Sequence, residues 1–67
     1  MNVELNGETI ALPSEDMSVS ELVEWRGIRN AGVAVAINNK IVSRPKWDDT
    51  RLSPGDSIVL ISAAYGG

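Results

Sequence analysis

The residues of this chain that could do chemistry lie at its carboxyl end, in the sequence Ala63-Ala64-Tyr65-Gly66-Gly67. Glycine tolerates backbone angles that other residues cannot adopt, so a diglycine end suits a narrow channel in another protein. The terminal carboxylate is ionised at neutral pH and is an oxygen nucleophile that can attack the α-phosphate of ATP. We therefore expect Gly67 to be activated as an acyl-adenylate, with Gly66 keeping the tail slim. The alternative is a passive end, because small residues are common at chain termini.

The rest of the composition offers little for an active site within the chain. Its 67 residues include no Cys and no His, which removes disulfides, thiolate nucleophiles, imidazole bases and the usual zinc ligands. A single domain of this size also has little room for a deep substrate pocket. The sequence thus predicts that this protein is not an enzyme but is acted on by enzymes. We expect it to hold no metal and no bound cofactor. The lack of Cys is compatible with the cytoplasmic location that we expect.

The charges are few and unevenly placed along the chain. The net charge is -3, and residues 1–25 hold six acidic and no basic residues, whereas residues 26–51 hold all six basic residues and two acidic ones. An acidic chain without a basic patch argues against nucleic acid as a partner. No apolar run approaches the roughly 20 residues of a membrane-spanning helix, so no membrane segment is expected. The charge asymmetry either orients a protein partner or reflects solvated surface.

The elements that must position the tail begin with a hairpin and a helix. Polar and apolar residues alternate over residues 2–6, and a second strand-like run, residues 9–12, follows Asn6-Gly7, a pair typical of a tight β-turn. Ser18 is a favourable helix N-cap, and Glu21, three residues later, completes a capping box. The sequence predicts a helix over about residues 19–26.

The second half of the chain predicts three further strands. Residues 33–37 and 57–62 are strongly apolar, and residues 40–42 form a short strand after a tight turn at Asn38-Asn39. Pro54-Gly55 has the signature of a type II turn before the last strand. The predicted order is two strands, a helix, two strands, a helical turn and a final strand.

The last strand is apolar at four consecutive positions and should therefore be central, paired in parallel with the first strand. The handedness rule for crossovers then places the helix on one face of a mixed sheet. This arrangement is the β-grasp, or ubiquitin-like, fold: an α+β domain with four to five strands and one main helix. We expect residues 1–62 to form the domain and residues 63–67 to form a flexible tail that carries the reactive carboxylate.

A few side chains are candidates for contacting a partner. Tyr65 either anchors the tail, together with Ala64, against a partner surface or packs back on its own sheet. Val59 and Ile61 alternate with the residues expected to face the helix, so they form either an exposed apolar patch for docking or additional core. Arg44 either pairs with acidic groups of a partner or is simply solvated.

Several short motifs occur together in this chain: Asn6-Gly7, the strand 33–37 with Asn38, Ile41-Val42 followed by Arg44 and Trp47, Leu52 with Gly55-Asp56, and Gly66-Gly67. In this combination the chain resembles the bacterial ThiS family of sulfur carriers of thiamine biosynthesis over essentially all of its residues. The family often has Val-Pro-Arg where this chain has Val42-Ser43-Arg44, with Pro45 in the next position.

The resemblance implies a two-step activation of the tail. A ThiF-type adenylating enzyme would use ATP to convert the Gly67 carboxylate to an acyl-adenylate. Sulfur supplied by a cysteine desulfurase would then displace AMP and give a thiocarboxylate, the sulfur donor to a ThiG-type thiazole synthase. Three rivals stay open: a carrier for another product, such as the small subunit of molybdopterin synthase, a ubiquitin-like protein modifier, and a binding module with an inert tail.

Overall fold

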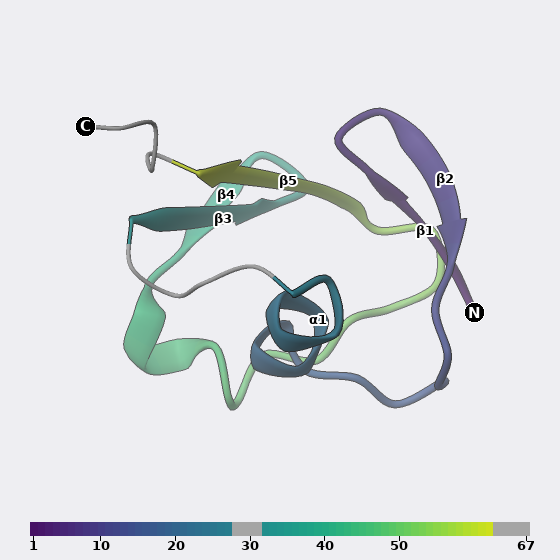
Figure 1. Ribbon diagram of the computed structural model, residues 1–67, viewed down its shortest axis with the longest axis horizontal. Helices are drawn as coiled ribbons and strands as arrows, with labels where there is room; N and C mark the ends of the chain where they lie inside the picture. The colour runs from purple at the N-terminus through teal and green to yellow at the C-terminus, as the bar shows by residue number, and fades with distance from the viewer. Residues whose placement is uncertain (28–31, 63–67) are drawn as a thin grey trace.

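One mixed sheet and one helix form the fold of the computed structural model, which describes residues 1–27 and 32–62. Its five strands lie in the order β2-β1-β5-β3-β4, and α1 covers one face (Figure 1). The predicted α+β, β-grasp architecture is confirmed. The elements are β1 (Asn2–Leu5), β2 (Glu8–Ala11), α1 (Val19–Trp25), β3 (Val33–Ile37), β4 (Lys40–Val42), the 3-10 helix η1 (Arg44–Lys46) and β5 (Ser57–Ser62).

The most apolar strand, β5, lies at the centre of the sheet, as predicted. It pairs in parallel with β1, where Leu5 lies opposite Ile58. On its other side it pairs antiparallel with β3, from Ile58 opposite Ile37 to Ser62 opposite Val33. The backbone ladders therefore hold the start of β5 through β1, and its run from Ile58 to Ser62 through β3.

Asparagine residues make the two tight turns that the sequence predicted. Asn6 has a φ of 50° and Gly7 a φ of 88°, and Asn38 and Asn39 have φ values of 50° and 71°. Positive φ at both central residues is the mark of a type I′ turn, whose twist matches the twist of the strands that it joins. Asn6 thus belongs to the turn, and β1 ends one residue earlier, at Leu5.

The helix begins as the sequence predicted and ends one residue earlier than expected. The amide of Glu21 donates to Ser18 Oγ at 3.1 Å, and the amide of Ser18 donates to Glu21 Oε1 at 2.8 Å, which completes the capping box. Trp25 is the last helical residue, because Arg26 is the C-cap and Gly27 takes a φ of 73°. A residue with positive φ cannot continue a right-handed helix.

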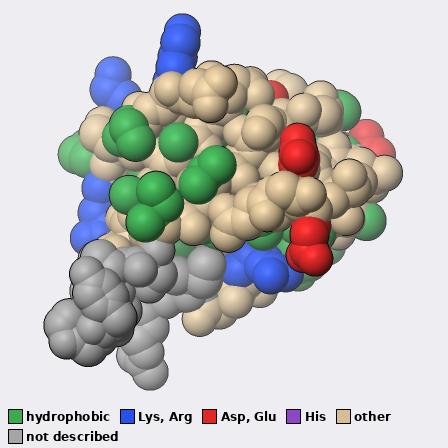
Figure 2. Space-filling view, turned by 90° about the horizontal axis from the view of Figure 1, so that it is seen from above, with side chains coloured by type: hydrophobic (Ala, Val, Ile, Leu, Met, Phe, Trp, Pro, Cys, Tyr) green, Lys and Arg blue, Asp and Glu red, His purple; other side chains and the backbone are tan. Residues whose placement is uncertain are grey.

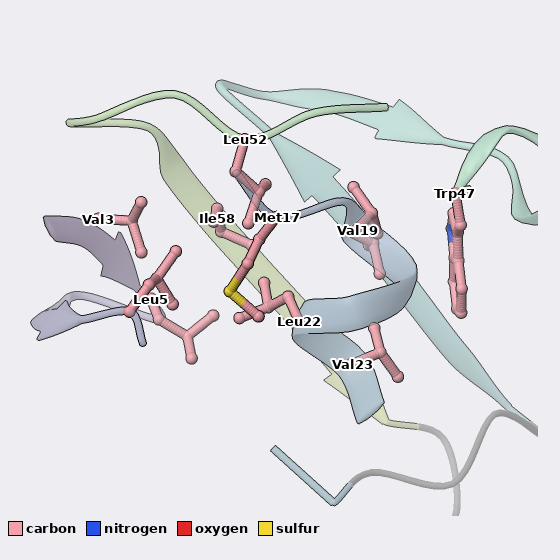
Figure 3. Packing of buried hydrophobic residues seen from close by; sticks show 11 residues of the cluster. Val3, Leu5, Met17, Val19, Leu22, Val23, Trp47, Leu52 and Ile58 are labelled. Carbon is pink, nitrogen blue, oxygen red and sulfur yellow. The ribbon is translucent and has the colours of Figure 1, made fainter. Parts of the chain in front are cut away.

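The core fills the space between α1 and the sheet (Figure 3). Leu22, on the middle turn of α1, is fully buried, and Trp47 is 4% exposed. Trp47 donates its indole Nε1 to the Val42 carbonyl at 2.9 Å, so its polar group is satisfied. Trp25, in contrast, is 43% exposed at the rim. The buried apolar residues are Val3, Leu5, Leu12, Met17, Val19, Leu22, Val23, Val35, Trp47, Leu52 and Ile58.

Replacing Ser18 by Ala is expected to destabilise the domain by about 1 kcal/mol, because the Glu21 amide loses its side-chain acceptor at the helix start. In a domain of this size, such a loss lowers the melting temperature by roughly 4–8 °C. Thermal unfolding followed by circular dichroism measures the shift. Ser53→Ala, at an exposed position of the loop before β5, is the control and should change the melting temperature by much less.

Candidate functional site

The side chains of β5 divide between the two faces of the sheet as the sequence predicted. Ile58 is 1% exposed and Leu60 packs against the core, whereas Val59 and Ile61 are 39% and 53% exposed. Val59 and Ile61 lie on the face opposite α1, so they are not part of the core. The alternative of an exposed apolar pair is the one that the structure shows.

Three strands contribute to an apolar surface around this pair. The ladder places Ala36 opposite Val59 and Ala34 opposite Ile61, and Ile41 of β4 lies opposite Ala36. Residues directly opposite each other in neighbouring strands share a face. Ile41 is 70% exposed, the most exposed of the large apolar side chains described. We call the surface formed by Ile41, Val59 and Ile61, with Ala34 and Ala36 between them, the apolar face.

Ile41 was not among the residues predicted for this surface, although the sequence indicates its position. A two-residue turn at Asn38-Asn39 places Lys40 opposite Ile37. Ile41 must then lie opposite Ala36, on the same face as Val59. The register set by a two-residue turn therefore predicts that Ile41 lies on this face.

Figure 2 looks onto the sheet from the side opposite α1. It shows apolar side chains gathered over one part of this face, with Lys and Arg beside them and Asp and Glu over another part. The separation of charge along the sequence is not kept everywhere on the surface, since Arg51 Nη1 lies 3.4 Å from Asp16 Oδ1 and 3.6 Å from Glu21 Oε1. A partner that covers the apolar side chains also meets a basic border.

Arg44 lies at a different place from the apolar face. It begins η1, which lies on the α1 side of the sheet (Figure 1). The segment after η1 contacts the start of α1, where the Val19 amide donates to the Thr50 carbonyl at 3.0 Å. The guanidinium carbon of Arg44 lies 5.2 Å from the centroid of the Trp47 ring, a cation–π geometry. The structure therefore does not bring Arg44 together with Val59 and Ile61.

The local sequence around Arg44 has a structural explanation. Ser43 is the N-cap of η1, and Pro45 occupies its first turn, where the missing amide hydrogen of proline costs no helical hydrogen bond. The order Ser43-Arg44-Pro45 thus still supports a helical turn directly after β4.

The other predicted site residues, Ala64, Tyr65, Gly66 and Gly67, lie outside the described residues, so their roles stay predictions. The last described residue, Ser62, pairs with Val33 at the end of the β3–β5 ladder. The apolar face therefore borders the point from which residues 63–67 continue. Within residues 1–27 and 32–62, no cluster of three or more Asp or Glu side chains forms a metal site. No helix in the same residues is long and apolar enough to cross a membrane.

Comparison with known proteins identifies the family. The model of the ThiS family matches residues 2–67. The chain belongs to the ThiS family. The sulfur carrier protein ThiS of Escherichia coli K12 is 42% identical over 50 residues, which cover 75% of this chain and 76% of that protein.

Solved structures of a family member have the same fold. The crystal structure of the thiamine biosynthesis protein ThiS of Geobacter metallireducens aligns over 100% of both chains, with a TM-score of 0.85 and 28% identity. The NMR solution structure of a thiamine biosynthesis protein from the same organism aligns over 100% of this chain and 88% of that chain, with a TM-score of 0.84. The family resemblance inferred from the short sequence motifs is confirmed.

Proposed function

We propose that this chain is a sulfur carrier whose Gly67 carboxylate is converted to a thiocarboxylate for thiamine biosynthesis. The observation that carries the proposal is the family match, which extends through the diglycine to residue 67. The E. coli relative is named a sulfur carrier protein, and the Geobacter relative a thiamine biosynthesis protein. Because the chain has no Cys, a carried sulfur atom has no side-chain thiol to occupy, which favours the terminal carboxyl group.

The proposed chemistry takes place at the Gly67 carboxyl group. A carboxylate oxygen first attacks the α-phosphate of ATP, so an acyl-adenylate forms and pyrophosphate leaves. The outer sulfur of a persulfide supplied by a cysteine desulfurase then attacks the carboxyl carbon, and AMP leaves with the bridging oxygen. A thiol finally reduces the S–S bond of the acyl disulfide and releases the thiocarboxylate. The carrier is thus a cosubstrate and not a catalyst. A ThiF-type enzyme catalyses the activation, and a ThiG-type thiazole synthase receives the sulfur in the cytoplasm.

The apolar face is the proposed docking surface for the adenylating enzyme. Its large side chains, Ile41, Val59 and Ile61, are 70%, 39% and 53% exposed, and an apolar patch beside a functional segment is typical of a protein interface. Docking there brings the end of β5, and with it the start of the tail, to the enzyme surface. Ala64 and Tyr65 would follow as contacts within the entrance to the channel. Arg44 would contact the enzyme only if the interface reaches around the β4 edge of the sheet.

The mass of the intact protein tests the proposed chemistry. The chain is incubated with ATP, a ThiF-type enzyme, a desulfurase with cysteine, and a thiol reductant, and we expect a mass increase equal to the replacement of one oxygen by sulfur. Fragmentation must place the added mass on Gly67, because oxidation of Met1 or Met17 gives almost the same increase. An unmodified Gly67, under conditions in which the enzyme activates a known carrier, would contradict the proposal. Isopeptide-linked adducts in cells would instead support a protein modifier.

The double substitution Val59→Thr, Ile61→Thr is expected to raise the KM of the adenylating enzyme for the carrier about tenfold, since truncating the centre of an interface commonly costs 1–2 kcal/mol. Threonine keeps the β-branched shape that suits a strand, so the sheet should persist. Steady-state pyrophosphate release at varied carrier concentration measures the effect. Thr9→Ala, at an exposed position of β2, is the control. An unchanged KM in the double variant would exclude the apolar face as the docking surface.

A further inference from the structure

The side chain of Asn6 extends the hydrogen bonding of β5 beyond the end of β1. The Leu60 amide donates to Asn6 Oδ1 at 2.9 Å, and Asn6 Nδ2 donates to the Leu60 carbonyl at 3.4 Å. The backbone amide of Asn6 donates to the Ile58 carbonyl at 2.8 Å. Backbone pairing of β1 with β5 reaches only to Leu5 opposite Ile58. The carboxamide of Asn6 therefore acts as the next peptide group of the parallel ladder.

This arrangement gives β5 a hydrogen-bond partner where the turn of the first hairpin takes the backbone of β1 away from it. The chain reverses at Asn6, with a φ of 50°, so the backbone of the first hairpin leaves β5 just where β5 continues toward the tail. A carboxamide carries a carbonyl and an NH2 group in one plane, so it can present one acceptor and one donor side by side, as a peptide group does. The Leu60 amide can only donate a hydrogen bond, and this fixes which end of the Asn6 carboxamide faces it.

The position of this contact links it to the tail. Leu60 lies between Val59 and Ile61 of the apolar face and two residues before Ser62. The Asn6 carboxamide holds Leu60 by two hydrogen bonds, two residues before the last described residue. Beyond Leu60, Ile61 and Ser62 continue the ladder with β3.

We propose that Asn6 is a positioning residue for the reaction at the tail, an inference that rests on the proposed function. By holding Leu60, Asn6 fixes the direction in which the chain leaves the sheet and thus where Gly67 reaches in the adenylating enzyme. Asn6 does not touch the reacting atoms. Its effect should therefore appear in the turnover number of adenylation and not in the affinity for the enzyme, which the apolar face provides.

The chain contains a matched control at the opposite end of the same strand. Asn38 also has a φ of 50°, accepts from the Ser57 amide at its Oδ1 at 3.0 Å, and donates its backbone amide to the Ser57 carbonyl at 2.7 Å. Both residues accept from a β5 amide at Oδ1, but Asn38 does so where the strand begins, and its Nδ2 donates to Asp56 Oδ1 at 3.1 Å instead of to a β5 carbonyl. Asn39, with a φ of 71°, is a second control in the same turn.

The experiment compares Asn6→Gly, Asn38→Gly and Asn39→Gly. Glycine accepts positive φ, so each substitution removes a side chain without straining the turn, and all three add a similar backbone entropy to the unfolded chain. Amide hydrogen exchange by NMR reports the local opening of β5, and adenylation at varied carrier concentration separates kcat from KM. Thermal unfolding checks that every variant is folded at the assay temperature.

In Asn6→Gly we expect the Leu60 amide to exchange about tenfold faster than in the wild type, because it loses its acceptor. We also expect kcat to fall roughly tenfold, since the Gly67 carboxylate would be held less often in position to attack ATP. KM should stay within about twofold in all three variants, and the two control variants should keep the wild-type kcat within a similar factor.

Two results would overturn the positioning role. An unchanged Leu60 exchange rate in Asn6→Gly would show that the carboxamide does not hold the strand. A kcat equal to that of Asn38→Gly would show that the contact only stabilises the fold. Failure of the wild-type chain to be adenylated is a separate result, which would refute the proposed function and the positioning role with it.

Discussion

Deletion of Gly67 is expected to reduce thiocarboxylate formation by at least about a hundredfold, because the carboxylate then ends one residue short of the position that it must reach. One extended residue spans about 3.5 Å, which is as large as the whole contact distance between reacting atoms. Gly66 would still carry a carboxylate, so a loss of thiocarboxylate formation would be due to the shorter tail and not to the absence of the functional group. Mass spectrometry of the product, normalised to total carrier, measures it.

Adding one Ala after Gly67 is the companion variant. It keeps both glycines but removes the carboxylate from Gly67 and places a methyl group next to the reacting carbon. Both variants leave residues 1–62 unchanged, so their melting temperatures should equal that of the wild type. Full thiocarboxylation of either variant would contradict the proposal that the channel of the adenylating enzyme accepts only a tail of the native length and width.

Replacement of Leu22 by Ala is expected to have the largest effect on stability. Leu22 is fully buried between α1 and the sheet, and truncation of such a residue costs about 2–5 kcal/mol. A domain of this size rarely has more than about 3–5 kcal/mol of stability from its core. We therefore expect a substantial unfolded fraction at 25 °C, measured by urea titration with circular dichroism.

The control for this variant is Ile41→Ala, at a position that is 70% exposed. It removes an aliphatic side chain from the surface, where substitutions usually change stability by less than about 0.5 kcal/mol. A change of less than 1 kcal/mol in Leu22→Ala would mean that the core can collapse around the missing side chain.

Most of the fold could be predicted because its signals are local. The Asn-Gly pair at residues 6 and 7, the capping box from Ser18 to Glu21 and the Pro54-Gly55 turn each depend on neighbours a few residues apart. The parallel pairing of β1 with β5 required one further inference: because residues 58–61 are all apolar, their strand should be central and so lie beside the first strand.

The site was harder to predict because its contacts are not local. Asn6 and Leu60 are 54 positions apart, and nothing in the sequence indicates that a turn residue reaches a strand so distant. The separation of Arg44 from the apolar face likewise depends on the path of the chain after β4, which carries η1 to the helix side. Ile41 needed only the register of a hairpin, and that register was available from the turn.

The central position of β5 has a consequence for how the protein folds. The strands β1 and β2 form one hairpin, β3 and β4 form another, and in the order β2-β1-β5-β3-β4 the two hairpins share no ladder with each other. Only β5, the last of the described elements, joins them. Closing a contact between distant segments is slow, so the arrival of β5 should set the folding rate. During synthesis on a ribosome, the two hairpins would therefore stay unjoined until β5, the strand that leads to the reactive tail, has been made.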